Sequence, residues 1–375
     1  MKIEKVTTRW VRVPLEKPVG WSIKTINWRE HLFVEIESDE GHVGVGCCLQ
    51  DISGKMAKAA MDELLVPMLL GRDPRDIEAL WSDMYYLTVR AGRRGNMAHA
   101  ISAIDIALWD HHGKLAGMPL HKLLGGYRTE IPCYASGGYY YPGEELFPQL
   151  RREVQSYVDK NYNGVKIRVG ALDAATDAKR AELAREVLGP GRKLMLDATQ
   201  GYRDVNSCLE LCRLVEDLDI YFLEEPLPID MVEAYRRLAE KTSIPLATGE
   251  NGATRWEFNE FVKQGSLSYL QPDATSCGGI SEWRKIATIA GANGVSVAPH
   301  YHWDVHTQLA AATPEVSILE KFEGTGVKVL DLLMDNPREV TDDGCLRPSD
   351  VPGVGIEWNP AQLDRYTIEQ NVHTA

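Results

Sequence analysis

Short apolar runs recur along residues 166–320, and each one ends at or close to an ionisable residue. These residues are Lys166, Asp197, Glu224, Glu250, Asp273, His300 and Glu320, and subtraction of their numbers gives steps of 31, 27, 26, 23, 27 and 20 residues. One strand, one helix and two short loops occupy about that length, so the spacing predicts a repeated βα unit that closes into a parallel barrel. The carboxyl ends of such strands open on one face, where we expect these side chains to converge.

The N-terminal part of the chain has a different pattern. Residues 1–50 contain two stretches of alternating apolar and polar positions, which predict β-strands. The residues between them, 17–30, are rich in Gly, Pro and polar groups and are expected to form a long loop, with Trp21 and Lys24 near its middle. This loop is either a lid over a site or a simple connector.

Helical spacing dominates residues 55–125, and together with the first 50 residues they form a smaller α+β domain. We expect this domain to span residues 1–126 and the barrel to span residues 127–349. Residues 350–375 are too few for a domain and are expected to pack back on the N-terminal one. A barrel of about 250 residues leaves room for this arrangement in a chain of 375.

Bulk composition excludes several classes of protein. The net charge of −13 and the absence of a Lys/Arg run argue against a nucleic-acid partner. The first residues lack a signal-peptide core, and no window approaches the roughly 18 apolar residues of a membrane span. The seven cysteines form no Cys-x-x-Cys pair, as is typical of buried thiols in a reducing compartment. We therefore expect a cytoplasmic protein without a membrane partner.

Three carboxylates fall on consecutive predicted strand ends: Asp197, Glu224 and Glu250. They would repel one another unless a cation lay among them, and hard oxygen ligands without nearby Cys or His favour Mg²⁺. The alternative is that each carboxylate caps the helix that follows it. Three such residues in register favour the metal site.

Asp273 and His300 lie on the next two predicted strands. A carboxylate that binds one ring nitrogen fixes the tautomer of the imidazole and raises the basicity of the other nitrogen, as a general base requires. A zinc site through His300, His302 and His306 is the alternative, but no further ligand follows at a useful spacing. Strand alternation would turn His302 to the same side as His300, so we expect His302 to line the pocket.

Lys166 and Arg168 lie two positions apart on one predicted strand and therefore face the same way. Two cations directed into a barrel mouth suit the carboxylate of a substrate. The alternative, a solvated pair on the surface, is disfavoured because apolar residues alternate with them.

Taken together, these motifs resemble the enolase superfamily, specifically its mandelate racemase-like branch, over essentially the whole chain. The resemblance rests on AISAIDIALWDHHGKLAGMPLHKLLGG, VKIRVG, LMLDATQ, FLEEP, ATGEN, LQPDATSCGG, VAPH, ILEKFE and PGVGIEW. It implies an N-terminal capping domain and a modified (β/α)₇β barrel. It also implies that Asp197, Glu224 and Glu250 bind Mg²⁺, that Asp273 and His300 form the catalytic dyad, and that Glu320 faces the enolate oxygen. The shared step is removal of the proton α to a carboxylate, which gives an enediolate stabilised by the metal.

The chain departs from the family pattern at two positions. Members of this branch often carry Lys-x-Lys on the second strand, with the second Lys as a base, but here that position is Arg168. A neutral Arg near neutral pH costs roughly 7 kcal/mol, against about 4.6 kcal/mol for a neutral Lys, so two-base racemisation is disfavoured. Thr199 also replaces the Asn that commonly follows the first ligand.

One base suits the loss of a β-hydroxyl, because His300 can take the α-proton and return it to the leaving hydroxide. The sequence therefore predicts dehydration of an acid sugar to a 2-keto-3-deoxy acid. The expected substrate-binding residues are Trp21, Lys24, Asn251, Thr275 and His302. The alternatives are a racemase or epimerase, or a cycloisomerase on a related lactone. A metal-dependent hydrolase would need a His-x-His on the first strand, and a non-catalytic role leaves the full set of charged residues without a purpose. A symmetric homo-oligomer is expected from the resemblance.

Overall fold

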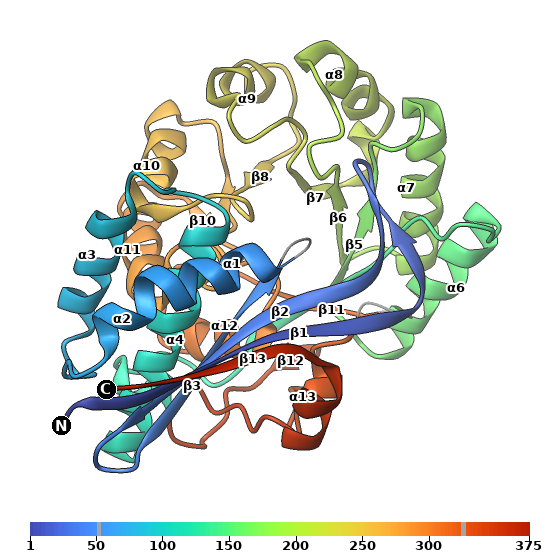
Figure 1. Cartoon of the computed structure of the whole chain (residues 1–375). Helices are drawn as coiled ribbons and strands as arrows, with labels where there is room; N and C mark the ends of the chain where they lie inside the picture. The colour runs from blue at the N-terminus through green and yellow to red at the C-terminus, as the bar shows by residue number, and fades with distance from the viewer. Residues whose placement is uncertain (51–53, 324–327) are drawn as a thin grey trace.

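Two sheets with different strand directions organise the molecule (Figure 1). A computed structural model describes residues 1–50, 54–323 and 328–375. Within them, an antiparallel sheet has the strand order β13-β1-β2-β3, and a parallel sheet has the order β10-β9-β8-β7-β6-β5-β4-β11. Figure 1 shows the parallel strands ringed by helices, with the antiparallel sheet lying across one side of the ring.

The antiparallel sheet is built from both ends of the chain. Its strands are β1 (Ile3–Gly20), β2 (Thr25–Ser38), β3 (Val43–Gln50) and β13 (Thr367–Thr374). Helix α4 (Asn96–Ala116) lies directly on β3, and two glycines permit this approach. A Cβ on Gly46 would lie 2.0 Å from the carbonyl oxygen of Ala103, and a Cβ on Gly44 would lie 2.0 Å from that of Ala107. The glycine spacing in GHVGVG therefore marks the line along which the helix meets the sheet.

The helices predicted between residues 55 and 125 are present. Besides α4 they are α1 (Gly54–Ala60), the π-helix η1 (Met61–Leu65), α2 (Val66–Leu69), α3 (Ile77–Thr88) and α5 (Leu120–Leu123). The apolar sides of α1 to α4 and of β1 to β3 form one core cluster, which is separate from the main core around the barrel, and Leu120 of α5 belongs to that main core.

Residues 17–30 form the end of a β-hairpin, so the prediction of a long loop there is wrong. β1 continues to Gly20, which pairs with Thr25 at the start of β2. The N–H of Trp21 donates to the carbonyl of Lys24 at 3.0 Å and closes the turn. Pro14, just before this segment, and Pro18 within it lack an N–H and break the apolar–polar alternation, but the two strands pair around them through a register shift.

Eight parallel strands alternate with seven helices, which confirms the (β/α)₇β order within the described residues. The strands are β4 (Ile131–Ser136), β5 (Gly164–Arg168), β6 (Lys193–Asp197), β7 (Ile220–Glu224), β8 (Leu246–Thr248), β9 (Tyr269–Leu270), β10 (Ser296–Val297) and β11 (Leu319–Phe322). The helices are α6 (Leu146–Asp159), α7 (Ala174–Leu188), α8 (Val205–Leu214), α9 (Val232–Ala239), α10 (Thr254–Gln264), α11 (Gly279–Ala292) and α12 (Trp303–Ala310). Val297 of β10 bridges Val316, just before β11, and this bridge closes the ring.

The barrel helices follow the periodicity of the sequence. In α8, Cys208, Leu211 and Cys212 are all buried against the barrel, one helical face at spacings of three and four residues. Asp204 caps the start of this helix, since its side chain accepts hydrogen bonds from the N–H groups of Asn206 and Ser207. All seven cysteines are unpaired thiols, six of them buried.

The end of the chain returns to the N-terminal sheet. After η3 (Asp331–Leu333), strand β12 (Cys345–Leu346) adds to β4, and α13 (Pro360–Tyr366) leads into β13. β13 pairs with β1, with Thr374 opposite Lys5, and Figure 1 shows the two termini close together. The domain boundaries at residues 126 and 349 stay predictions. Of the helices in the described ranges, none combines the length and hydropathy needed to cross a bilayer.

Candidate active site

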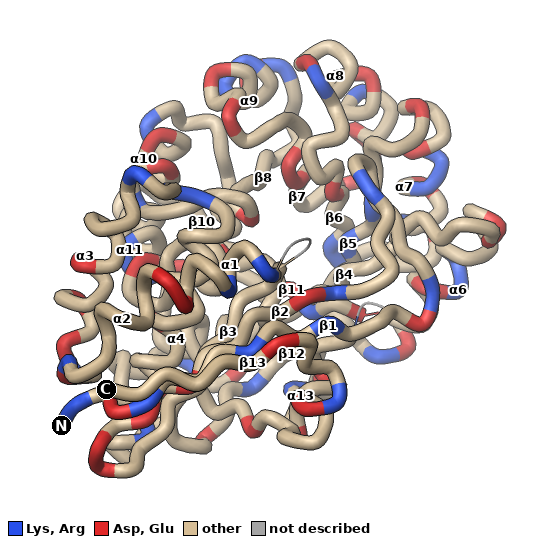
Figure 2. The backbone as a smooth tube through the Cα atoms, in the orientation of Figure 1, with Lys and Arg blue, Asp and Glu red and all other residues tan. Residues whose placement is uncertain are grey.

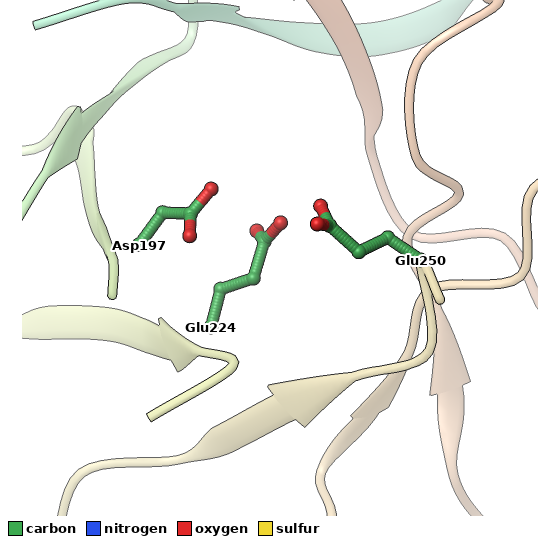
Figure 3. Close-up of side chains that lie close together, drawn as sticks. All are labelled: Asp197, Glu224 and Glu250. Carbon is green, nitrogen blue, oxygen red and sulfur yellow. The ribbon is translucent and has the colours of Figure 1, made fainter. Parts of the chain in front are cut away.

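Three carboxylates meet at the carboxyl ends of adjacent barrel strands (Figure 3). Asp197 ends β6, Glu224 ends β7, and Glu250 follows β8 by two residues. One oxygen from each lies within 4.8 Å of the other two, and Figure 3 shows the carboxylates pointing toward one another. Oxygen ligands about 2.1 Å from Mg²⁺ stand about 3 Å apart when adjacent and about 4.2 Å apart when opposite. Small side-chain rotations therefore suffice for these three to hold one hard divalent cation.

Two buried cations on β5 lie beside this acidic trio. Lys166 Nζ is 2.8 and 2.7 Å from the two carboxylate oxygens of Glu224, and Arg168 Nη1 contacts Asp197. Figure 2 shows basic positions near β5 and acidic positions near β6 and β7, inside the ring of helices. The side chain of Lys166 is 0% exposed and that of Arg168 is 6% exposed, so the alternative of a solvated surface pair is wrong.

Glu320 of β11 completes the charged layer from the other side. Its Oε1 lies 2.7 Å from Lys166 Nζ, and its Oε2 accepts a hydrogen bond from the N–H of Tyr301 at 2.8 Å. Burial alone would raise the pKa of Glu320, but Lys166, His300 and Arg168 lower it to about 2. Burial alone would likewise lower the pKa of Lys166, while Glu224 and Glu320 raise it above its ordinary value. Both groups therefore stay charged at neutral pH.

Asp273 and His300 lie next to each other, as the sequence predicted. His300 Nδ1 is 3.0 Å from Asp273 Oδ2, and its Nε2 is 3.3 Å from Glu250 Oε2. Asp273 is itself fixed, because the N–H and the hydroxyl of Thr275 donate to its Oδ1 at 2.7 and 2.8 Å. Since an ionised carboxylate only accepts, Nδ1 carries the hydrogen and Nε2 is the nitrogen available for proton transfer.

The electrostatics of this dyad favour a charged imidazole when no cation balances the carboxylates. Burial alone would lower the pKa of His300, but Glu250 and the hydrogen bond to Asp273 raise it to about 9. For Asp273, burial alone would raise the pKa, but the hydrogen bond from His300, the charges of His300 and His306 and the N–H of Thr275 together leave the pKa below its ordinary value. The dyad therefore consists of a carboxylate and an imidazole with high proton affinity.

Thr199 takes a structural position beside the first ligand. Its N–H and its hydroxyl both donate to Asp197 Oδ1, at 2.8 Å each. These two bonds orient the carboxylate, which leaves Oδ2 toward the centre of the site. Thr199 thus holds Asp197 from the position at which the family commonly has Asn.

A cavity of about 210 Å³ opens above these groups, between the barrel and the β1–β2 hairpin. Four of the five expected substrate-binding residues line it: Trp21, Lys24, Asn251 and Thr275. The hairpin tip is held there by Ser22, whose Oγ lies 2.6 Å from the carbonyl oxygen of Ala198 and 2.9 Å from that of Thr199. Residues 21–24 therefore cover the mouth of the barrel and do not merely connect two strands.

His302 does not line this cavity, and its expected role is wrong. β10 ends at Val297, and the backbone at Tyr301 has a φ of 54°, so strand alternation no longer applies at residues 300–302. The ring of His302 is fully buried, with Nε2 3.0 Å from Cys47 Sγ. In the described ranges, the carboxylate trio is the one group of three or more His, Cys, Asp or Glu side chains that could share a metal, which removes the zinc alternative.

Several cavity residues were missed in the sequence. Tyr139 lies in the loop after β4, lines the cavity and belongs to no sequence motif. Its hydroxyl accepts a hydrogen bond from Arg168 Nη2 at 2.9 Å. Arg29 lines the cavity from the hairpin, inside the segment that was expected to be a loop. Gln200 lines it from the loop after β6, three residues past Asp197. Gln200 and Tyr139 shared one usable signal, since loops that follow barrel strands form the active-site face, whereas Arg29 had none.

Comparison with known proteins gives the family. Residues 3–125 match the model of the mandelate racemase / muconate lactonizing enzyme N-terminal domain, and residues 149–362 match the enolase C-terminal domain-like model. The chain is 35% identical over 345 residues to an arabinonate dehydratase from Saccharolobus solfataricus, with 90% of each chain covered. It is 32% identical over 382 positions to a D-galactarolactone cycloisomerase from Agrobacterium fabrum, covering 98% of this chain and 99% of the relative.

Solved structures agree with this assignment. An L-talarate dehydratase from Polaromonas sp. JS666, complexed with Mg and L-glucarate, superposes with a TM-score of 0.91 at 32% identity. The match covers 100% of this chain and 99% of the other. The chain therefore belongs to the mandelate racemase/muconate lactonizing enzyme family of the enolase superfamily.

Proposed function

We propose that this protein is a Mg²⁺-dependent hydro-lyase that dehydrates an acid sugar to a 2-keto-3-deoxy acid. The observation that carries the proposal is His300, which is paired with Asp273 and lines the same cavity as Glu250 of the carboxylate trio, while Arg168 lines it from β5 and cannot serve as a second base. The relatives named as dehydratases of sugar acids, and the neighbour complexed with Mg and L-glucarate, support it.

Asp197, Glu224 and Glu250 would hold the Mg²⁺ ion. When bound, the ion withdraws negative charge from the substrate carboxylate as the α-proton leaves. Lys166 binds the carboxylate alongside, since its ammonium group is buried and stays protonated between Glu224 and Glu320. Glu320 holds this ammonium group in place, with Oε1 2.7 Å from Lys166 Nζ.

His300 moves the proton. Nε2 takes the hydrogen from the α-carbon, and Asp273 stabilises the imidazolium through Nδ1–H. The pair of electrons left on carbon expels the β-hydroxyl, and the imidazolium returns its proton to that group, so water leaves. The resulting enol then tautomerises to the 2-keto acid. One group serves as base and acid in turn, so no second base is needed.

Arg168 keeps its charge throughout. Burial alone would lower its pKa, but Tyr139 and Glu320 raise it above the ordinary value for arginine. Because a guanidinium of this kind does not release a proton at neutral pH, Arg168 orients Asp197 and binds an anionic group. This role opposes racemisation, which needs a second proton donor on the other face of the substrate.

The substrate is a small polyhydroxylated carboxylate. Polar residues from several elements line the cavity, among them Gln200, Asn251, Thr275 and Ser276. We further place the enzyme in the cytoplasm as a symmetric homo-oligomer, on the grounds of its unpaired cysteines and of the resemblance to its family.

Incubation with a panel of aldonic and aldaric acids in the presence of Mg²⁺ tests the proposal, with the 2-keto product as the readout. We expect at least one acid to react and the reaction to stop on chelation of the metal. If no acid in a broad panel yields a keto acid, the dehydratase assignment is wrong.

A cycloisomerase is the second candidate, favoured by the similarity to the Agrobacterium protein over nearly the full length of both chains. Reaction in D₂O separates the two activities. A dehydratase converts an open-chain acid to a keto acid with loss of water, whereas a cycloisomerase opens or closes a ring without loss of water and therefore acts on a lactone or anhydro acid. A racemase returns an epimer of the substrate that carries deuterium at the α-carbon and gives no keto acid.

A further inference from the structure

A buried carboxylate outside the metal trio holds two amide side chains of the cavity. Glu225 follows Glu224 and is fully buried. Its Oε2 accepts hydrogen bonds from Asn251 Nδ2 at 2.9 Å and from Gln200 Nε2 at 3.1 Å. The backbone N–H of Gln200 also donates to the carbonyl oxygen of Glu225, at 2.6 Å. Gln200 is thus joined to Glu225 through both its backbone and its side chain.

These contacts fix which end of each amide faces the cavity. Oε2 of Glu225 is an acceptor for both amides, so each must present its NH₂ group to it. The second N–H of Asn251 is used as well, since Nδ2 lies 3.1 Å from Glu250 Oε1. Each amide thus turns its NH₂ group toward a carboxylate, and the acceptor at its other end is the carbonyl oxygen. Both side chains line the cavity that His300 faces, so each can offer its carbonyl oxygen there as an acceptor.

The backbone around these residues is held in an uncommon conformation. Gln200 has a φ of 60° and Glu225 has a φ of 39°. Both values lie in the left-handed region, which residues other than Gly and Asn seldom adopt. Such a conformation is energetically unfavourable and persists where the surrounding contacts enforce it. The arrangement of the two amides is therefore set by the loops that carry them and is not an accident of rotamer choice.

We infer that Gln200 and Asn251 recognise the hydroxyl groups of the substrate chain beyond the leaving hydroxyl, by accepting hydrogen bonds through their carbonyl oxygens. Glu225 is the positioning residue that turns both acceptors toward the cavity. This inference rests on the proposed function for the class of substrate, and it adds which part of that substrate is selected. A group that cannot donate a hydrogen bond, such as fluorine, a ketone or a second carboxylate, would leave both acceptors unpaired.

Deoxyfluoro sugar acids test the inference, because fluorine is close to a hydroxyl in size but cannot donate. The probes are arabinonate, galactonate and galactarate, each compared with analogues in which one hydroxyl beyond the leaving one is replaced by fluorine. For wild-type enzyme with Mg²⁺, kcat/KM is measured where the acid reacts, and the dissociation constant is measured by calorimetry where it does not. We expect at least one fluorine position to weaken either quantity by about 10-fold, the size of one lost hydrogen bond.

Gln200→Met and Asn251→Leu should remove this penalty, so that acid and fluoro analogue become equivalent within about 2-fold, even though the parent acid itself binds less well. Glu225→Met should also remove the fluorine penalty, while the affinity for Mg²⁺ stays unchanged. If Glu225 only supported the fold, its replacement would not act on the fluorine penalty alone. Gln155→Met is the matched control, since Gln155 is an exposed amide on α6, and it should keep the full penalty.

The outcomes separate this inference from the proposed function. Dehydration without any fluorine penalty, or a penalty that both amide variants retain, would overturn the role of Gln200 and Asn251 while leaving the dehydratase intact. A fluorine penalty in binding without keto-acid formation would support the amide pair and refute the dehydratase. If Glu225→Met fails to fold by circular dichroism, the two single amide variants still decide the matter.

Discussion

At the scale of single residues, the chemistry of the site depends on which groups can exchange a proton. His300 presents Nε2 to the cavity with Nδ1 bound to Asp273, whereas Lys166 and Arg168 stay charged in their acidic surroundings. These residues could be predicted from the sequence because each is an ionisable group at the end of an apolar run. His302 was assigned wrongly because the chain leaves the strand before it, at Val297.

His300→Asn should abolish turnover, with a loss in kcat of at least about 10² to 10⁴-fold, because asparagine cannot take the α-proton. The affinity for Mg²⁺, measured by calorimetry, should change by no more than about 3-fold, since the three ligands are untouched. A variant that retained the wild-type rate would show that another group is the base.

Arg168 should act through its charge. We expect Arg168→Met to lower kcat/KM by about 10² to 10³-fold, the size of the loss of one electrostatic contact to a developing charge. Arg168→Lys keeps the charge and should retain more activity than Arg168→Met. In D₂O, unreacted substrate recovered from wild-type enzyme should keep its configuration, as NMR can establish. Inverted, deuterated substrate would mean that Arg168 or a neighbour serves as a second base.

At the scale of elements, the β1–β2 hairpin is the part of the fold that could not be predicted from the sequence. The barrel strands and α8 follow simple periodicities, and their order was predicted correctly. In the hairpin, by contrast, Pro14 and Pro18 interrupt the alternation, and the pairing resumes only through a register shift that the sequence does not reveal. Gln200 and Tyr139 were missed for a related reason: they lie in loops whose paths depend on tertiary contacts.

Removal of the Ser22 hydroxyl should loosen the hairpin tip. In Ser22→Ala, the tip loses its bond to the carbonyls of Ala198 and Thr199, worth about 1 kcal/mol net. We expect KM to rise by about 3 to 10-fold because the cavity is less well covered, and the melting temperature to fall by less than about 3 °C. Ser156→Ala, which removes a hydroxyl bonded within helix α6, is the control and should leave KM unchanged. An unaltered KM in Ser22→Ala would argue against a role for the tip in binding.

At the scale of the whole molecule, the barrel brings together carboxylates from three separate βα units, and their proximity couples metal binding to folding. Asp197, Glu224 and Glu250 are far apart along the chain but have oxygens within 4.8 Å of one another. The overall fold and the site were predictable because the repeat of about 25 residues appears in the sequence, whereas the contact between the hairpin and the barrel mouth was not.

Mg²⁺ should stabilise the folded protein, since only that state gathers the three ligands. At a concentration 100 times the dissociation constant, the gain is about 2.7 kcal/mol, and the melting temperature measured by calorimetry should rise accordingly. Asp197→Asn should show little or no rise at the same concentration. If neither Mg²⁺ nor a chelator changed the melting temperature of the wild-type protein, the proposed metal site would be contradicted.

The pairing of β13 with β1 determines when, during synthesis, the antiparallel sheet can be completed. β1 precedes the barrel along the chain and β13 follows it, so the sheet that covers the barrel mouth stays one strand short until β13 has been synthesised. The barrel, which is complete earlier in the chain, is able to form ahead of its cover. A nascent chain stalled before β13 emerges should therefore hold a formed barrel under an incomplete N-terminal sheet.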